Sequence, residues 1–248
     1  MYFKTNKMSI YYEKYNDKNK SIIILPGWGN TRKTFDYIIN YFKSNYTVYI
    51  FDYPGWGNSK IPKKELTIYD YAETIKKFII KNKINNPIII AHSFGGRIAS
   101  ILETYYKIKI DKMVLIDIAG IKPKKTIKKY IREKIYKLLK RIFKNNEKAK
   151  KKLFSIFAST DYQELPKEMH KTFKNIINED LTKYFKHIQS ECLLIWGKLD
   201  TATPLKDGYK ISKLIKNSAI IIYPNGNHFP YIQYPEQTNK IIECFLKN

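Results

Sequence analysis

Short apolar runs alternate with helix-compatible stretches along most of this chain. A run such as Ser21–Leu25, with four consecutive apolar residues, is typical of a strand that is covered on both faces of a sheet. Strands that alternate with helices predict a mostly parallel, twisted sheet with helices on both faces, here with a hairpin at its N-terminal edge. The expected strands are 1–4, 10–15, 21–25, 46–51, 87–91, 112–116, 191–196 and 219–223, and the expected helices are 31–42, 67–82, 94–106, 207–216 and one from about 235 to the end.

The stretch 122–186 interrupts this alternation with helical spacing and no strand signal. We therefore expect an α/β core made of residues 1–121 and 187–248, with a helical cap, residues 122–186, inserted after the sixth strand. Within 126–143 the apolar residues form one stripe along a helix, and lysine and arginine fill the opposite face.

The chain has 248 residues and a net charge of +24, which is concentrated in the expected cap. Residues 122–152 carry 15 basic and 2 acidic side chains, a net charge of +13. The chain is also rich in Ile, Asn and Tyr, whose codons resemble those of lysine in base composition, so genome composition explains part of the charge. A basic stripe is either an ordinary solvated face or the footprint of an anionic partner. Nucleic acid is not expected as that partner, because arginine is scarce and no nucleic-acid-binding motif is present.

The cysteines and the apolar runs indicate in which compartment of the cell the protein is expected. Cys192 and Cys244 form neither a disulfide framework nor a zinc site, and both stand in apolar runs, so we expect two buried thiols. The first residues have no apolar leader region, and no apolar run approaches 18 residues. These observations favour a soluble cytoplasmic protein.

The loops that follow the expected strands carry the candidate chemistry, because ligands of parallel sheets bind outside the carboxyl ends of the strands. In the segment Ala91-His92-Ser93-Phe94-Gly95-Gly96, a strand turns directly into a helix. A serine in such a turn is presented outward, and the small neighbours Ala91 and Gly95 let strand and helix approach closely. Two later strands are followed by Asp200 and by His228.

The order Ser93, Asp200, His228, each just past a strand, resembles the α/β-hydrolase superfamily over nearly the whole chain, and least in the cap. Ala91 replaces the first glycine of that family's G-x-S-x-G elbow. The loop Leu25-Pro26-Gly27-Trp28-Gly29 resembles its H-G-x-G oxyanion loop, with proline in place of histidine.

The resemblance implies a role for each residue. Ser93 would be the nucleophile, His228 the base, and Asp200 the acid that orients His228. The backbone N–H groups of Trp28 and Phe94 would form the oxyanion hole. No cofactor and no metal are implied.

Several alternatives stay open within this family. Asp117, just after the strand 112–116, is the rival for the acid. His92 is expected to pack under the elbow, and His170 and His187, at the insertion, are not expected to be catalytic. A serine at the nucleophile position argues against the branches that use aspartate, such as haloalkane dehalogenases and epoxide hydrolases.

We expect a serine hydrolase that cleaves a carboxylic ester of small to medium acyl chain through an acyl-enzyme. Hydrolysis of C–C or amide bonds by the same triad, or ligand binding without catalysis, are the alternatives, since a fold does not determine a function. The Trp28 loop resembles that of capped carboxylesterases that act on methyl esters of carrier-bound acyl groups. This resemblance implies that the apolar cap face lies over the triad, and that the basic face meets an acidic acyl-carrier protein or another anionic surface.

Overall fold

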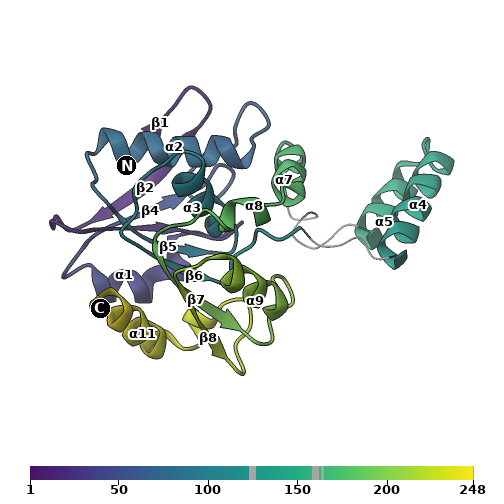
Figure 1. Ribbon diagram of the computed structural model, residues 1–248. Helices are drawn as coiled ribbons and strands as arrows, with labels where there is room; N and C mark the ends of the chain where they lie inside the picture. The colour runs from purple at the N-terminus through teal and green to yellow at the C-terminus, as the bar shows by residue number, and fades with distance from the viewer. Residues whose placement is uncertain (123–126, 158–161, 163–164, 248) are drawn as a thin grey trace.

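The computed structural model describes residues 1–122, 127–157, 162 and 165–247. The described chain forms an 8-stranded sheet in the order β1-β2-β4-β3-β5-β6-β7-β8 (Figure 1). β1 and β2 form an antiparallel edge hairpin, β2 runs antiparallel to β4, and the six strands from β4 to β8 are parallel. The strands are β1 (Tyr2–Lys4), β2 (Ser9–Tyr15), β3 (Ser21–Leu25), β4 (Thr47–Asp52), β5 (Ile88–His92), β6 (Lys112–Ile116), β7 (Glu191–Gly197) and β8 (Ser218–Tyr223).

Successive residues of each central strand point to opposite faces, and both faces are buried. In β3, Ile22 and Ile24 belong to one apolar cluster while Ile23 and Leu25 belong to the other. Each fully buried aliphatic side chain contributes about 1.5–3 kcal/mol relative to exposure. The predicted mostly parallel sheet with helices on both faces is therefore confirmed.

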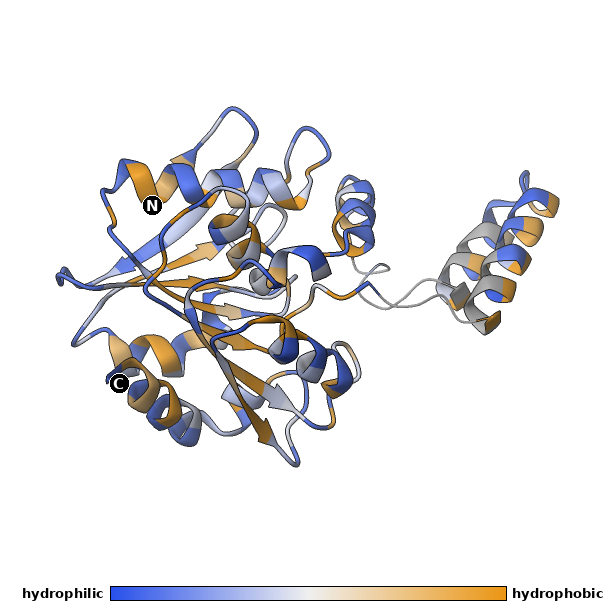
Figure 2. Cartoon of the chain, in the orientation of Figure 1, coloured by the Kyte–Doolittle hydropathy of each residue, from blue (hydrophilic) through white to orange (hydrophobic). Residues whose placement is uncertain are grey.

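Helices cover both faces of the sheet (Figure 1). The first face packs against α2 (Ile68–Lys81), α3 (Phe94–Thr104) and α9 (Leu205–Leu214), and the second against α1 (Asp36–Phe42) and α11 (Pro235–Lys247). Figure 2 shows the apolar strands enclosed between these helices, whose outer faces are polar.

Some local features differ from the sequence prediction. The expected helix 31–42 begins as a 3-10 helix, η1 (Arg32–Phe35), before α1, and a short α10 (Pro230–Gln233) was not predicted. Cys192 is buried as expected, but Cys244 is exposed. The expectation for Cys244 was wrong because it stands two positions, more than half a helical turn, from the buried Ile242 of α11.

The insertion divides into two parts. Its return limb, α7 (Met169–Asn178) and α8 (Thr182–Phe185), packs on the core, and the N–H of Leu181 donates to the carbonyl of Gly120 at 2.9 Å. The outer part, α4 (Ile127–Ile142) and α5 (Glu147–Phe157), forms a helical hairpin that stands away from the sheet (Figure 1).

The structure does not place the apolar stripe of α4 over the predicted triad, as the family resemblance implied. Apolar side chains of this stripe are exposed. Figure 2 shows hydrophobic and hydrophilic residues alternating along the ribbon of the hairpin. Helical spacing identifies an apolar face of a helix, but it does not determine which part of the protein that face packs against. The exposed members are Ile127, Ile131, Ile135, Leu138 and Ile142. Among the described residues, no helix is both long and apolar enough to span a membrane.

Candidate active site

Ser93 stands in a strained turn between β5 and α3. Its backbone angles are φ 47° and ψ −111°, a region that non-glycine residues rarely occupy and that costs about 1–3 kcal/mol. Hydrogen bonds hold the turn: the N–H of Ser93 donates to Ile116 at 3.0 Å, and its carbonyl accepts from Gly96 at 3.1 Å and Ala119 at 2.9 Å. The sequence segment thus forms the sharp strand-to-helix elbow that its small residues predict.

Glycine at position 95 lets the elbow approach the loop after β3. A Cβ atom on Gly95 would lie 1.9 Å from the carbonyl oxygen of Leu25, which no side chain could tolerate without a backbone shift. This approach brings Trp28 beside the elbow, where its ring lies 5.2 Å from that of Phe94, measured between centroids. Phe94 is the first residue of α3, so its N–H has no acceptor within the helix.

Asp200 and His228 form a direct pair. His228 Nδ1 lies 2.7 Å from Asp200 Oδ2, and Asp200 Oδ1 accepts from the backbone N–H groups of Ala202 and Thr203 at 2.7 and 3.0 Å. Burial opposes ionisation of Asp200, but the hydrogen bonds from His228 and Thr203 outweigh it and hold the pKa of Asp200 below its ordinary value. Asp200 is therefore an anion held against the imidazole ring.

His92 connects the elbow to the loop that carries His228. Its Nε2 lies 2.7 Å from the carbonyl oxygen of His228, and its Nδ1 lies 3.3 Å from the side-chain nitrogen of Asn30. Because a carbonyl can only accept, Nε2 carries the proton and Nδ1 accepts from Asn30. Burial, followed by the nearby His228, lowers the pKa of His92 to about 3, so this ring stays neutral.

The elbow and the Asp200–His228 pair are thus joined through His92. Within the described residues, no hydrogen bond links the hydroxyl of Ser93 to His228. Catalytic hydrogen bonds are often long or poorly aligned before substrate binds. His92 is buried next to the elbow, as expected, but its hydrogen bonds to Asn30 and to the carbonyl of His228 were not predicted.

The rival acid Asp117 and the two histidines of the insertion region are bonded or stacked against other groups. Asp117 accepts the N–H of Gly197 through Oδ1 at 2.9 Å, and it is fully buried. His170 stacks on Tyr162 with ring centroids 4.2 Å apart, and His187 is exposed. Asp200, rather than Asp117, is the carboxylate bonded to His228.

Aromatic rings from four parts of the chain form a wall next to the elbow. The ring of Trp28 lies 4.4 Å from Trp56 and 5.3 Å from Phe173 of α7, in addition to its contact with Phe94. The indole N–H of Trp28 is buried and has no hydrogen-bond partner among the described residues. These rings form a packed aromatic cluster beside the elbow.

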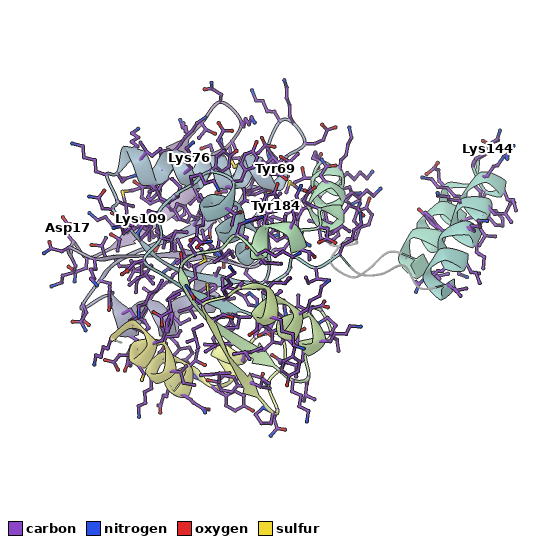
Figure 3. All side chains as sticks on the ribbon, in the orientation of Figure 1. Asp17, Tyr69, Lys76, Lys109, Lys144 and Tyr184 are labelled. Atoms are coloured by element: carbon purple, nitrogen blue, oxygen red, sulfur yellow. The ribbon has the colours of Figure 1, made fainter. Side chains whose placement is uncertain are left out.

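Polar contacts fix α7 and α8 against α2. The hydroxyl of Tyr69 lies 2.8 Å from that of Tyr184 and donates to Glu179 at 3.0 Å (Figure 3). Arg97, which is buried, donates to the carbonyl of Glu179 at 2.8 Å. A cavity of about 390 Å³ beside these contacts contains none of the predicted catalytic residues; it is lined by Thr67, Ile68, Tyr69, Lys174, Asn175, Asn178 and Glu179.

One cluster of described residues has the donor types of a metal site. Asp117, Asp200 and His228 each offer an atom within 4.8 Å of the others. The direct hydrogen bond between His228 Nδ1 and Asp200 Oδ2 already uses two of these atoms. Asp200 and His228 within this cluster therefore form a hydrogen-bonded acid–base pair.

Comparison with known proteins agrees with this geometry. Residues 20–132 match the family model described as the alpha/beta hydrolase fold. The chain is 27% identical to the pimeloyl-[acyl-carrier protein] methyl ester esterase of Wigglesworthia glossinidia brevipalpis, over 92% of this chain and 93% of that protein. It is 26% identical to the putative esterase/lipase 2 of Mycoplasma genitalium, over 97% and 94%.

Solved structures share the fold over the full chain. The enol-lactonase from Burkholderia xenovorans LB400 superposes with a TM-score of 0.77 and 17% identity, and the alignment covers 100% of both chains. The observed sheet and elbow agree with these similarities. The chain therefore has the α/β-hydrolase fold and resembles the α/β-hydrolases in sequence, and its relatives include proteins named as esterases.

Proposed function

We propose that this protein is a serine hydrolase that cleaves a carboxylic ester of small to medium acyl chain. The observation that carries the proposal is the Asp200–His228 pair, bonded at 2.7 Å and linked through His92 to the strained elbow of Ser93. The esterase names of the sequence relatives support ester hydrolysis.

In the proposed mechanism, Ser93 Oγ attacks the ester carbonyl while His228 Nε2 takes the hydroxyl proton. The N–H groups of Trp28 and Phe94 donate to the oxyanion, where loss of one donor typically costs about 10²–10³ in rate. His228 then gives the proton to the leaving alcohol, and an acyl-Ser93 remains. Water, deprotonated by His228, releases the acid and regenerates the serine.

Asp200 contributes to this mechanism through the tautomer of His228. Because Oδ2 accepts from Nδ1, it keeps the proton on that nitrogen and leaves Nε2 free to act as the base. The negative charge also stabilises the imidazolium that forms during attack.

An acyl-carrier protein is the partner we propose for the α4–α5 hairpin. One relative is named for an acyl-carrier-protein ester, and residues 122–152 carry a net charge of +13, which complements an acidic surface. Exposed lysines on the described part of the hairpin include Lys137, Lys140 and Lys144, the last near its outer end (Figure 3).

Hydrolysis of p-nitrophenyl acetate through hexanoate by the wild type and Ser93→Ala tests the activity. We expect Ser93→Ala to reduce turnover by at least about 10³-fold, because the variant has no nucleophile. Equal turnover by both proteins would reject the proposal. Labelling by a fluorophosphonate that Ser93→Ala abolishes is an independent check.

A further inference from the structure

Asp117 is a buried carboxyl group to which the proposed mechanism assigns no role. It directly follows β6, has 0% exposure and adopts a positive φ of 41°. Oδ1 accepts one hydrogen bond, from Gly197, and Oδ2 is enclosed without a partner among the described residues. An ionised carboxylate with one donor in such a position would be poorly compensated.

A second carboxyl group shares the space around Asp117. Carboxylate atoms of Asp117 and Asp200 and a ring nitrogen of His228 lie within 4.8 Å of one another. The hydroxyl of Thr203 lies between the two acids, 3.0 Å from the main-chain oxygen of Asp117 and 2.5 Å from Asp200 Oδ2. Tyr231, a buried phenol of α10, is a further titratable neighbour.

The two acids receive very different support. Asp200 accepts from two backbone N–H groups and from His228, with the Thr203 hydroxyl also in reach, whereas Asp117 accepts from Gly197. Two like charges so close together in a dry site are not both ionised. Burial above all, and then the nearby Asp200, raise the pKa of Asp117 to about 9, against the opposing hydrogen bond from Gly197.

We propose that Asp117 is a protonated, neutral acid at neutral pH, and that it is a reserve acid that ionises beside His228 when Asp200 loses its charge. Asp117 and Asp200 would together carry one negative charge, which is on Asp200 in the wild type. The reserve role rests on the proposed function, whereas the protonation of Asp117 does not.

Infrared difference spectroscopy tests the protonation directly. At neutral pH, the wild type should show the carbonyl stretch of a protonated carboxylic acid, and Asp117→Asn should lose that band. Asp200→Asn should lose it too, because Asp117 then ionises. Asp17→Asn, at an exposed aspartate (Figure 3), is the matched control and should keep it. A band that Asp117→Asn leaves unchanged, or no band at all, would overturn the proposal.

Thermal unfolding across pH gives a second test. A protonated Asp117 makes the folded state bind a proton that the unfolded chain releases above about pH 4. Wild-type stability should therefore fall relative to Asp117→Asn as pH rises from about 4 toward 9, the value to which the pKa of Asp117 is raised. The melting temperature of the wild type minus that of Asp117→Asn should decrease over that range and then level off. A difference independent of pH, or of opposite sign, would contradict the protonated state.

Kinetics in the Asp200→Asn background tests the reserve role. Adding Asp117→Asn should lower kcat a further tenfold or more, and Asp117→Asn alone should cost far less than Asp200→Asn. Equal kcat for Asp200→Asn and the double variant would reject the reserve role. A loss for Asp117→Asn as large as for Asp200→Asn would make Asp117 the charged acid and overturn the proposal. If no ester is hydrolysed at all, the proposed function fails, while the spectroscopic and thermal results still decide the protonation of Asp117.

Discussion

At the scale of single residues, the chemistry of the candidate site follows from where loops leave the sheet. The sequence predicts that Ser93, Asp200 and His228 each follow a strand, at the edge where the carboxyl ends of parallel strands meet, and their catalytic roles stay a prediction. The contact of His92 with the carbonyl of His228 could not be predicted, since it joins positions 136 residues apart through one backbone oxygen. Side-chain-to-backbone contacts of this kind require no particular residue type at the accepting end.

His92 allows a prediction about how the base is held in place. His92→Phe fills a similar volume but cannot donate to His228, so a part-buried carbonyl loses its partner at a cost of up to about 1–3 kcal/mol. If this cost falls on the active geometry, kcat should drop about tenfold or more. His92→Gln, whose amide N–H can replace Nε2–H, should recover most of the loss.

Steady-state kinetics on a p-nitrophenyl ester, together with melting temperatures, separate positioning from folding. A positioning role lowers kcat with little change in KM, and the glutamine variant restores it. Identical kcat for the phenylalanine and glutamine variants would show that His92 only fills space.

At the scale of elements, helix periodicity predicted the helices of the insertion but not what they cover. Spacing identifies the apolar stripe of α4, yet α7 is the described helix of the insertion that reaches the aromatic wall, through Phe173. Packing partners depend on the three-dimensional path of the chain, which periodicity does not contain.

Phe173 should therefore influence acyl-chain preference. Phe173→Ala removes a ring 5.3 Å from Trp28, so KM for hexanoate esters should rise several-fold while KM for acetate changes little. Ile177→Ala, at an exposed position of the same helix, is the matched control. KM is measured for the acetate and hexanoate esters with both variants. An equal change in KM for the two esters in Phe173→Ala would refute a role of Phe173 in chain selection.

At the scale of the whole molecule, charge and apolar exposure coincide on the α4–α5 hairpin. The 31 residues 122–152 carry a net +13, and the same helices expose an apolar stripe. The sequence predicted this amphipathic character correctly, whereas the domain boundaries at 122 and 186 stay a prediction.

Charge reversal tests whether the hairpin binds the proposed carrier. Lys137→Glu, Lys140→Glu and Lys144→Glu together should weaken binding of an acidic acyl-carrier protein about tenfold or more at low salt, because they remove attraction and add repulsion. Hydrolysis of a small p-nitrophenyl ester should be unaffected. The same reversal at the exposed Lys83, Lys216 and Lys240 is the control.

Fluorescence titration of the carrier, repeated with anionic lipid vesicles, distinguishes the partners. Binding to vesicles but not to the carrier would replace the carrier proposal with a membrane surface. Equal effects of the two triple variants would show that only the overall charge of the protein matters.

The hydrogen bond between Leu181 and Gly120 has a consequence for the redesign of this chain. The two ends of the insertion meet at this bond, so the insertion is a loop that is closed at the core. The entropic cost of closing such a loop grows only slowly with its length. Residues between the two ends can change in number and sequence without altering how the strands connect. Within the described residues, the core that carries the candidate site is thus joined to the returning end of the insertion by this backbone hydrogen bond and by the contacts of Tyr69 and Arg97 with Glu179.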